Sequence, residues 1–191
     1  MKTNETALIT KTVFSDDGAK RYLLQKVWDS KLPKLSVIML APSTASGIEL
    51  DSTNMLVLNN SAALGFGSVD VLNLFSTVND FSLKQAEVDD PENMDFILAS
   101  AKEADTILFC PGVGKAKNKT FIQRQQQVLE ALRAYEDKLY CLTNEKGDAR
   151  LQHPLSPAVR HWTLSPLKVN ELLPEPVKAE KAEKKKAKAK A

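Results

Sequence analysis

The sequence predicts an α/β fold of three layers, in which a central, mainly parallel sheet of four strands lies between helices. Four short apolar runs alternate along the chain with stretches whose apolar residues recur at helical spacing. The connections are short and polar, which is typical of parallel strands joined by right-handed helical crossovers. The run at residues 35–40 lies between two prolines and lacks the alternation of a half-solvated strand, so we expect it to be buried on both faces.

The length and composition are those of one globular domain, which we expect over residues 1–173. With 191 residues, 43% of them hydrophobic, the chain can bury about 70% of its unfolded surface. Cys110 and Cys141 lack the spacing of metal ligands, so we expect buried thiols, no disulfide, and no metal or other cofactor. No apolar run approaches the roughly 20 residues of a membrane span, so we expect a cytoplasmic protein without a membrane partner.

Residues 174–191 differ from the rest of the chain in charge. They hold seven lysines and three glutamates, a net charge of +4, which leaves −2 on residues 1–173 out of the total of +2. Because this segment has no apolar face, we expect a disordered tail or a frayed helix. Two roles stay open for it: a solvated tail, and a sequence-independent contact with nucleic-acid phosphates that added salt weakens.

The N-terminal part of the domain predicts a β-hairpin. Residues 7–14 and 22–28 are rich in β-branched and aromatic side chains, and the Asp-Gly pair within residues 15–18 is typical of a sharp turn. A short amphipathic helix over residues 20–29 is the alternative, and the strand is favoured.

After the strand at residues 35–40, the sequence predicts a loop and then a helix beginning near Thr53. Asp51 or Ser52 has the side chain of a helix N-cap. The residues that recur at helical spacing are Met55, Leu56, Asn59 and Ala63. Gly65 and Gly67 end this run.

The same alternation continues to residue 142. Strands are expected at residues 69–74, 106–110 and 138–142. The capping-box spacing of Ser82 and Gln85 predicts a short helix, and Asp90-Pro91 predicts the start of another, with Met94, Ile97, Leu98 and Ala101 on one face. A longer helix is expected over residues 119–135, with Ile122, Leu129 and Leu132 facing inward.

Polar side chains follow the ends of these strands. Because the carboxyl ends of parallel strands meet at one edge of a sheet, where α/β proteins bind ligands, we expect a site there. The candidate residues are Pro42, Ser43, Thr44, Asp51, Asn73, Asn144, His153 and Ser156. The turn at residues 111–114 leaves the third strand toward the same edge.

Several stretches of the chain resemble a bacterial and phage family filed as domain of unknown function number 1643. The resemblance is carried by residues 39–45, 51–53, 69–75 and 139–142 and by the His-Pro-Leu sequence at 153–155, within about residues 13–167. It implies no established activity. Because members are often carried on phages, plasmids and other mobile elements, it implies a role in handling or defending nucleic acid.

The order of these pieces also resembles, more distantly, the uracil-DNA glycosylase superfamily. A proline-containing loop follows the first strand, Leu-Asn ends the second, a small-residue turn follows the third, and His-Pro-Leu-Ser-Pro follows the fourth. This resemblance implies that Asn73 reads the edge of a flipped base by two hydrogen bonds. It also implies that His153 stabilises the departing base, a contribution of about 3 kcal/mol.

At one position the chain departs from the glycosylase pattern. Ala41 stands before Pro42, where glycosylases carry an aspartate or asparagine that activates water. A methyl group cannot do this. Two roles stay open for Asp51: it takes over the activation of water, or it only caps the next helix.

Structural interpretations stay open for the other candidates as well. In the structural interpretation of Asn73, its side chain bonds backbone at a strand end. In that of His153, the residue is a structural or exposed loop residue, and in that of Ser43 and Thr44, the hydroxyls only form a turn. The turn at residues 111–115 lacks the spacing of a phosphate-binding loop. We interpret the lysines that follow it as a basic rim that touches nucleic-acid phosphates. They are Lys115, Lys117 and Lys119.

Three functions are therefore compatible with the sequence. The first is a nucleobase- or nucleic-acid-binding protein with a glycosylase-like fold and little or no hydrolysis, whose partner is DNA or a nucleotide. The second is an active base-excision hydrolase with Asp51 and His153 as catalytic residues. The third is an interaction protein of a mobile element that contacts a protein partner at the same edge. The sequence does not predict the oligomeric state.

Overall fold

The structure is a computed structural model that describes residues 1–43, 47–78, 81–115, 117–144, 146–147 and 150–173. These residues form a sheet of seven strands in the order β1-β2-β4-β3-β5-β6-β7. The four central strands run parallel to one another. They are β3 (Lys34–Met39), β4 (Ser68–Asn73), β5 (Thr106–Phe109) and β6 (Leu139–Thr143). The predicted α/β class and its parallel core are therefore confirmed.

Three antiparallel strands extend the sheet beyond the four that were predicted. The expected hairpin is confirmed as β1 (Ile9–Phe14) and β2 (Arg21–Val27), and β2 continues the sheet by pairing with β4. At the opposite edge, β7 (Thr163–Pro166) pairs with β6. The sheet therefore has more strands than predicted. The sequence did not indicate β7, because this short Thr-Leu-Ser-Pro segment lacks the apolar run of a buried strand.

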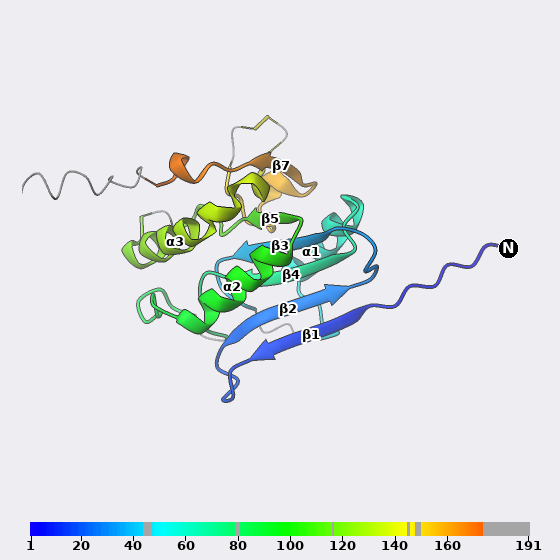
Figure 1. The fold of residues 1–191 in the computed structure, drawn as a ribbon, viewed down its shortest axis with the longest axis horizontal. Helices are drawn as coiled ribbons and strands as arrows, with labels where there is room; N and C mark the ends of the chain where they lie inside the picture. Colours follow the sequence, from blue (N-terminus) through cyan, green and yellow to red (C-terminus); the bar gives the residue numbers. More distant parts are fainter. Residues whose placement is uncertain (44–46, 79–80, 116, 145, 148–149, 174–191) are drawn as a thin grey trace, which may run out of the picture.

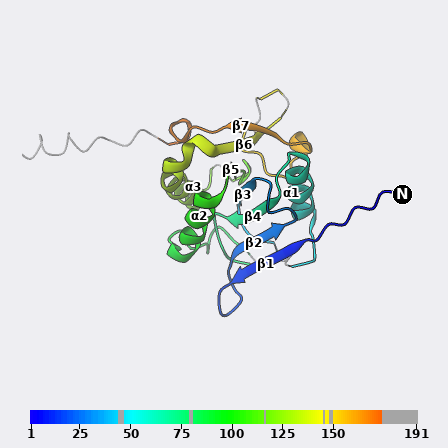
Figure 2. The same ribbon diagram turned by 45° about the vertical axis from the view of Figure 1, so that its right-hand side comes forward.

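Helices cover both faces of the sheet, as Figures 1 and 2 show. Helix α1 (Ser52–Ala63) lies on one face, and α2 (Pro91–Glu103) and α3 (Lys119–Ala131) lie on the other. Each face has its own apolar core: Val57 of α1 packs with Val37 and Val71, whereas Ile97 of α2 packs with Ile38 and Leu72. The strands therefore present alternate side chains to different helices.

A side chain caps each helix at its N-terminus. Asp51, Asp90 and Asn118 accept hydrogen bonds from the backbone N–H groups three residues further on. Of the two predicted cap candidates Asp51 and Ser52, Asp51 is the cap, and the predicted helix start at Asp90-Pro91 is confirmed. The helix expected at residues 82–85 is wrong, since the segment is a turn closed by the Gln85 N–H on the Ser82 carbonyl.

The third long helix is shorter than expected. It ends at Ala131, and a 3-10 segment, η1 (Leu132–Lys138), continues to β6. Leu129 and Leu132 are buried as predicted, but Ile122 is exposed and Arg124 takes the inward position. Two further 3-10 turns are η2 (Pro157–Val159) and η3 (Val169–Glu171).

The two cysteines are buried free thiols, as predicted. Burial raises the pKa of Cys110 far above its ordinary value, so this thiol stays protonated. In the described part of the chain, no helix combines the length and apolar character that crossing a membrane requires. The tail predicted at residues 174–191 lies outside the described residues.

Candidate functional site

The carboxyl ends of β3, β4 and β5 lie side by side. Met39 is in register with Asn73, and the ladder continues past both strands through the Leu74 N–H, which donates to the Met39 carbonyl at 2.8 Å. On the other side of β3, the Cys110 N–H donates to the Ile38 carbonyl at 2.9 Å. In this strand order the connections from β3 and from β5 turn to opposite faces, so this edge is the switch point where α/β folds bind ligands.

Asn73 projects toward the face that α1 covers. Val71 and Val69, two and four positions earlier in β4, belong to the core on that face, and strand side chains alternate. The Asn73 side chain is 1% exposed. Its backbone carbonyl accepts a hydrogen bond of 3.0 Å from Asn93 Nδ2 of α2, which fixes the end of β4 from the opposite face. The alternative in which the Asn73 side chain only bonds backbone at the strand end differs from the structure, because Asn73 Oδ1 accepts from the Arg21 side chain.

Arg21, at the start of β2, connects the Asn73 side chain to the loop after β3. Its Nη2 donates to Asn73 Oδ1 at 3.3 Å, and its Nη1 donates to the Ser43 carbonyl at 3.3 Å. Burial lowers the pKa of Arg21 to about 10, against the opposing effect of the Asp51 charge. The guanidinium therefore stays charged at neutral pH.

One atom of the Asn73 side chain is buried without a partner. Nδ2 has no hydrogen-bond acceptor among the described residues, while Oδ1 is bonded to Arg21. A buried polar atom in this condition costs about 1–3 kcal/mol. An acceptor atom on a ligand offsets that cost.

Asp51 and Asn54 of α1 form the next part of the site. Asp51 Oδ1 accepts the Asn54 backbone N–H at 2.7 Å and Asn54 Nδ2 at 3.1 Å. Asn54 Nδ2 also lies 3.4 Å from Ser43 Oγ, which joins the helix to the loop that Arg21 holds. Asn54 Oδ1 is a second buried atom without a hydrogen-bond partner in the described segments.

His153 belongs to the loop after β6 and packs against the turn that follows β5. A Cβ placed on Gly112, whose φ is +85°, would stand 3.2 Å from the His153 Cβ, so the imidazole packs directly on this glycine. The Leu155 backbone N–H donates to His153 Nδ1 at 3.2 Å, which assigns the proton of the neutral ring to Nε2. Burial lowers the pKa of His153, and the nearby Asp51 charge opposes this shift. At neutral pH the ring is therefore a neutral donor through Nε2.

The structure thus joins four predicted residues through direct contacts or charge. Ser43, Asp51 and Asn73 belong to one chain of hydrogen bonds through Arg21 and Asn54, and Asp51 acts on His153 electrostatically. Pro42 is buried in the same loop. Thr44 lies outside the described residues.

The other predicted residues have different surroundings. Ser156 Oγ donates to Gln152 Oε1 at 2.9 Å, so this hydroxyl supports the His153 loop from within. The Asn144 carbonyl accepts the Gly147 N–H and closes a turn after β6. Lys115, Lys117 and Lys119 are exposed between β5 and the first turn of α3.

Sequence reasoning missed Arg21 and Asn54. Arg21 belongs to an antiparallel strand, so an argument from the exits of parallel strands does not reach it. A signal existed, because Arg21 opens an otherwise apolar stretch, Tyr22 to Leu24, directly after a turn. Asn54 is the third residue of α1 after the cap. Polar side chains are common in the first turn of a helix, so nothing in the sequence indicated that this one is buried in the site.

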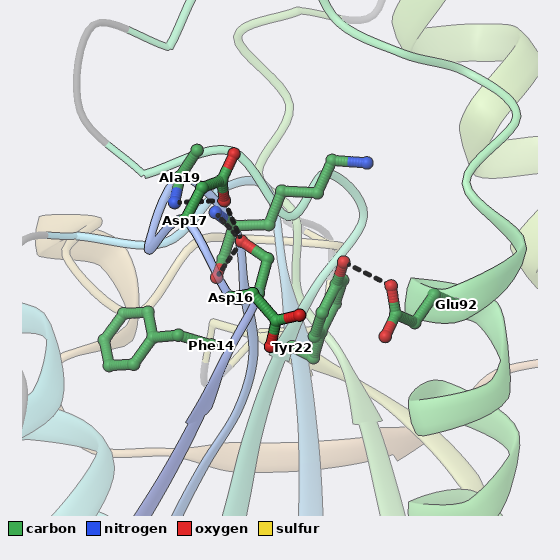
Figure 3. A pocket seen from close by; sticks show the side chains of 8 residues that line it. Phe14, Asp16, Asp17, Ala19, Tyr22 and Glu92 are labelled. Atoms are coloured by element: carbon green, nitrogen blue, oxygen red, sulfur yellow. Dashed lines mark hydrogen bonds between the residues drawn. The ribbon is translucent and has the colours of Figure 1, made fainter.

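A pocket of about 520 Å³ lies elsewhere, between the hairpin turn and α2 (Figure 3). Asp16, Asp17 and Glu92 line it, and the Tyr22 hydroxyl donates to Glu92 at 2.6 Å. These carboxylates repel phosphate groups, and no residue predicted for the site lines this pocket. The candidate site is therefore the carboxyl edge and not the hairpin pocket.

The donor set at this edge favours hydrogen bonding over metal coordination. Within the described ranges, no three His, Cys, Asp or Glu side chains are placed to hold a metal ion. What the site offers is one neutral imidazole N–H, one buried amide NH₂, one buried amide carbonyl and one carboxylate. Such a set suits a planar ligand with donors and acceptors on its edge.

The family model described as "Protein of unknown function (DUF1643)" matches residues 21–155. This range begins at Arg21 and includes Asn54, Asn73 and His153, so it spans the whole hydrogen-bonded site. No curated protein matches the chain.

Proposed function

This chain belongs to the family described as protein of unknown function DUF1643, and from the geometry of its site we propose that it binds a nucleobase within a nucleic acid. The observation that carries the proposal is the buried Asn73 amide, whose Nδ2 lacks a partner among the described residues, near the switch point of a parallel sheet. A base edge supplies the missing acceptor, and His153 Nε2 supplies a second donor.

The resemblance to the uracil-DNA glycosylase superfamily supports the same proposal. In that pattern an asparagine at the end of the second parallel strand reads the base, and a histidine in a later loop faces its departing edge. Asn73 ends β4, and His153 packs on Gly112 after β5. A base enters such a pocket only after it leaves the stack, which costs a few kcal/mol and is easiest at a mismatch or in a single strand.

The exposed lysines next to the site supply the contact with phosphates. Lys115, Lys117 and Lys119 precede or open α3, close in sequence to the Gly112 turn that supports His153. Each lysine that neutralises a phosphate releases a counterion, so binding weakens as salt rises. The lysines of residues 174–191 add to the same effect.

Binding of oligonucleotides tests the proposal. We expect the full-length chain to bind a fluorescent single strand and a duplex with one mismatch, more tightly at 50 mM than at 200 mM salt. Asn73→Ala and His153→Ala each remove a donor and lower the affinity about tenfold. Asn59→Ala and His161→Ala, at exposed positions, are the matched controls. The proposal is wrong if the wild-type chain does not bind at low salt, or if the controls lose as much affinity.

A second candidate function is hydrolysis of the bond between base and sugar. It is favoured by the charge coupling of Asp51 to His153, which places a carboxylate near the donor that would meet the departing base. Asp51 Oδ1 is already bonded twice to Asn54, so activation of water would depend on the other carboxylate oxygen. Incubation with oligonucleotides that contain uracil or damaged bases decides the question. Formation of abasic sites that His153→Ala slows about 100-fold supports hydrolysis, and their absence leaves a binding protein.

A further inference from the structure

The contact between Arg21 and Asn73 determines which way the Asn73 amide faces. A guanidinium only donates hydrogen bonds, and Arg21 Nη2 lies 3.3 Å from Asn73 Oδ1. An amide turned by 180° would set its own NH₂ against the guanidinium N–H groups, with both partners buried. The orientation with Oδ1 toward Arg21 is therefore the stable one.

This orientation leaves a donor for the ligand. One lone pair of Oδ1 is taken by Arg21, and the buried NH₂ of Asn73 has no acceptor in the described structure. The glycosylase resemblance implies that Asn73 forms two hydrogen bonds with the base edge. Because Arg21 occupies Oδ1, we expect the bond donated by Nδ2 to dominate the recognition of the base. A ligand that presents an amino group at this point places donor against donor at a buried position.

We propose that Arg21 is a specificity-determining positioning residue, which makes the site prefer nucleobases with a carbonyl group over those with an amino group at the corresponding ring position. The inference rests on the proposed nucleobase site and adds the class of base that it accepts. Arg21 acts through Asn73 and does not itself have to touch the ligand. Its charge is retained at neutral pH, so the orientation of the amide does not change over the physiological range.

Two pairs of nucleosides test this preference by calorimetric titration of the full chain. Uridine carries a carbonyl group where cytidine carries an amino group, and the neighbouring ring nitrogen is protonated in uridine and unprotonated in cytidine. Inosine and adenosine differ in the same way. We expect uridine and inosine to bind at least about tenfold more tightly than cytidine and adenosine, because a buried donor left unpaired is strongly rejected.

Arg21 variants separate the positioning role from a merely structural one. In Arg21→Met the amide is free to turn, and we expect the affinity ratio within each pair to fall to about twofold. Arg21→Lys retains a donor for Oδ1 and should retain the ratio. The matched control is Lys26→Met, because Lys26 is another buried cation of β2, and its Nζ bonds the Gly47 carbonyl and Thr10 Oγ1 away from Asn73. A structural role would weaken both members of a pair equally and leave the ratio unchanged.

The outcomes distinguish this inference from the function on which it rests. If the wild-type chain binds none of the four nucleosides and no oligonucleotide, the proposed function and the inference both fail. If it binds carbonyl and amino members equally, or if Arg21→Met keeps the tenfold ratio, only the inference fails. If Arg21→Met does not fold, the Asn73 Nδ2 proton resonances of the wild-type chain decide: inosine should shift them downfield, and an equal shift with adenosine overturns the inference.

Discussion

Asn93 of α2 is the residue whose removal tests most directly how the fold holds the site. It is fully buried, and its Nδ2 donates to the Asn73 carbonyl at 3.0 Å and to the Leu74 carbonyl at 3.2 Å. In Asn93→Ala both bonds are lost. Arg124 Nε still serves the Leu74 carbonyl at 2.7 Å, whereas the Asn73 carbonyl is left without this donor.

The magnitude follows from these contacts. Two neutral hydrogen bonds contribute about 1 kcal/mol each, and a buried carbonyl without a donor costs about 1–3 kcal/mol. Asn93 Oδ1 has no partner in the described residues, so its removal offsets part of this loss. We expect Asn93→Ala to lower the free energy of unfolding by about 3 kcal/mol. For a domain of this size, that corresponds to a Tm lower by about 6–12 °C.

Urea denaturation with an unchanged m-value measures this loss. Asn59→Ala is the control, because Asn59 is exposed on α1, and its effect should stay within about 0.5 kcal/mol. A loss below about 1 kcal/mol for Asn93→Ala would refute the reasoning, since it would mean that the end of β4 needs no support from α2.

Three further predictions concern His153 and its neighbours. The lowered pKa of His153 means that the unfolded chain binds its proton more readily, so this residue contributes stability that is present above pH 6.5 and lost as the pH falls below it. Because protonation removes the Nδ1 acceptor, the protection factor of the Leu155 N–H, which is the ratio of its intrinsic exchange rate to the observed rate at the same pH, should fall between pH 7.5 and pH 5. Asp51→Asn keeps an N-cap and should change the free energy of unfolding by less than about 0.5 kcal/mol, yet NMR titration should give a still lower His153 pKa, because the opposing charge is gone. Gly112→Ala and Gly65→Ala both strain a φ of +85° and should each cost about 1 kcal/mol in thermal unfolding, but only Gly112→Ala should weaken oligonucleotide binding, because only its methyl group meets His153.

The sequence predicted those parts of the fold whose cause is local. Short apolar runs without alternation gave the parallel strands, and an acidic residue before a helical pattern gave the caps at Asp51 and Asp90. The buried face of α1 was less accessible to this reasoning. Met55 recurs at helical spacing but is 46% exposed, while Asn54 and Ser61 are buried. Asn54 Nδ2 bonds within the polar site, and Ser61 Oγ donates to the Val57 carbonyl of the same helix.

The candidate site was predictable in outline and not in its connections. Strand direction alone placed Asn73 and the loop of Ser43 at one edge. It did not predict that they share a guanidinium, because Arg21 reaches this edge from a strand that runs the opposite way, so that its first residue lies beside the last residues of β4. An antiparallel neighbour contributes its beginning to the edge where parallel strands contribute their ends.

The same principle explains why buried cations surround this edge. Strand ends and loops there expose carbonyl groups that the sheet does not satisfy. Arg21 donates to the Ser43 carbonyl, and Arg124 donates to the Leu74 and Val88 carbonyls. Burial lowers the pKa of both cations, which indicates that desolvation opposes their charge and that the carbonyl contacts have to be well formed. Carbonyl groups held in this way are fixed before a ligand arrives, so binding does not have to position them. The Nδ2 group of Asn73, which has no acceptor among the described residues, remains available for recognition.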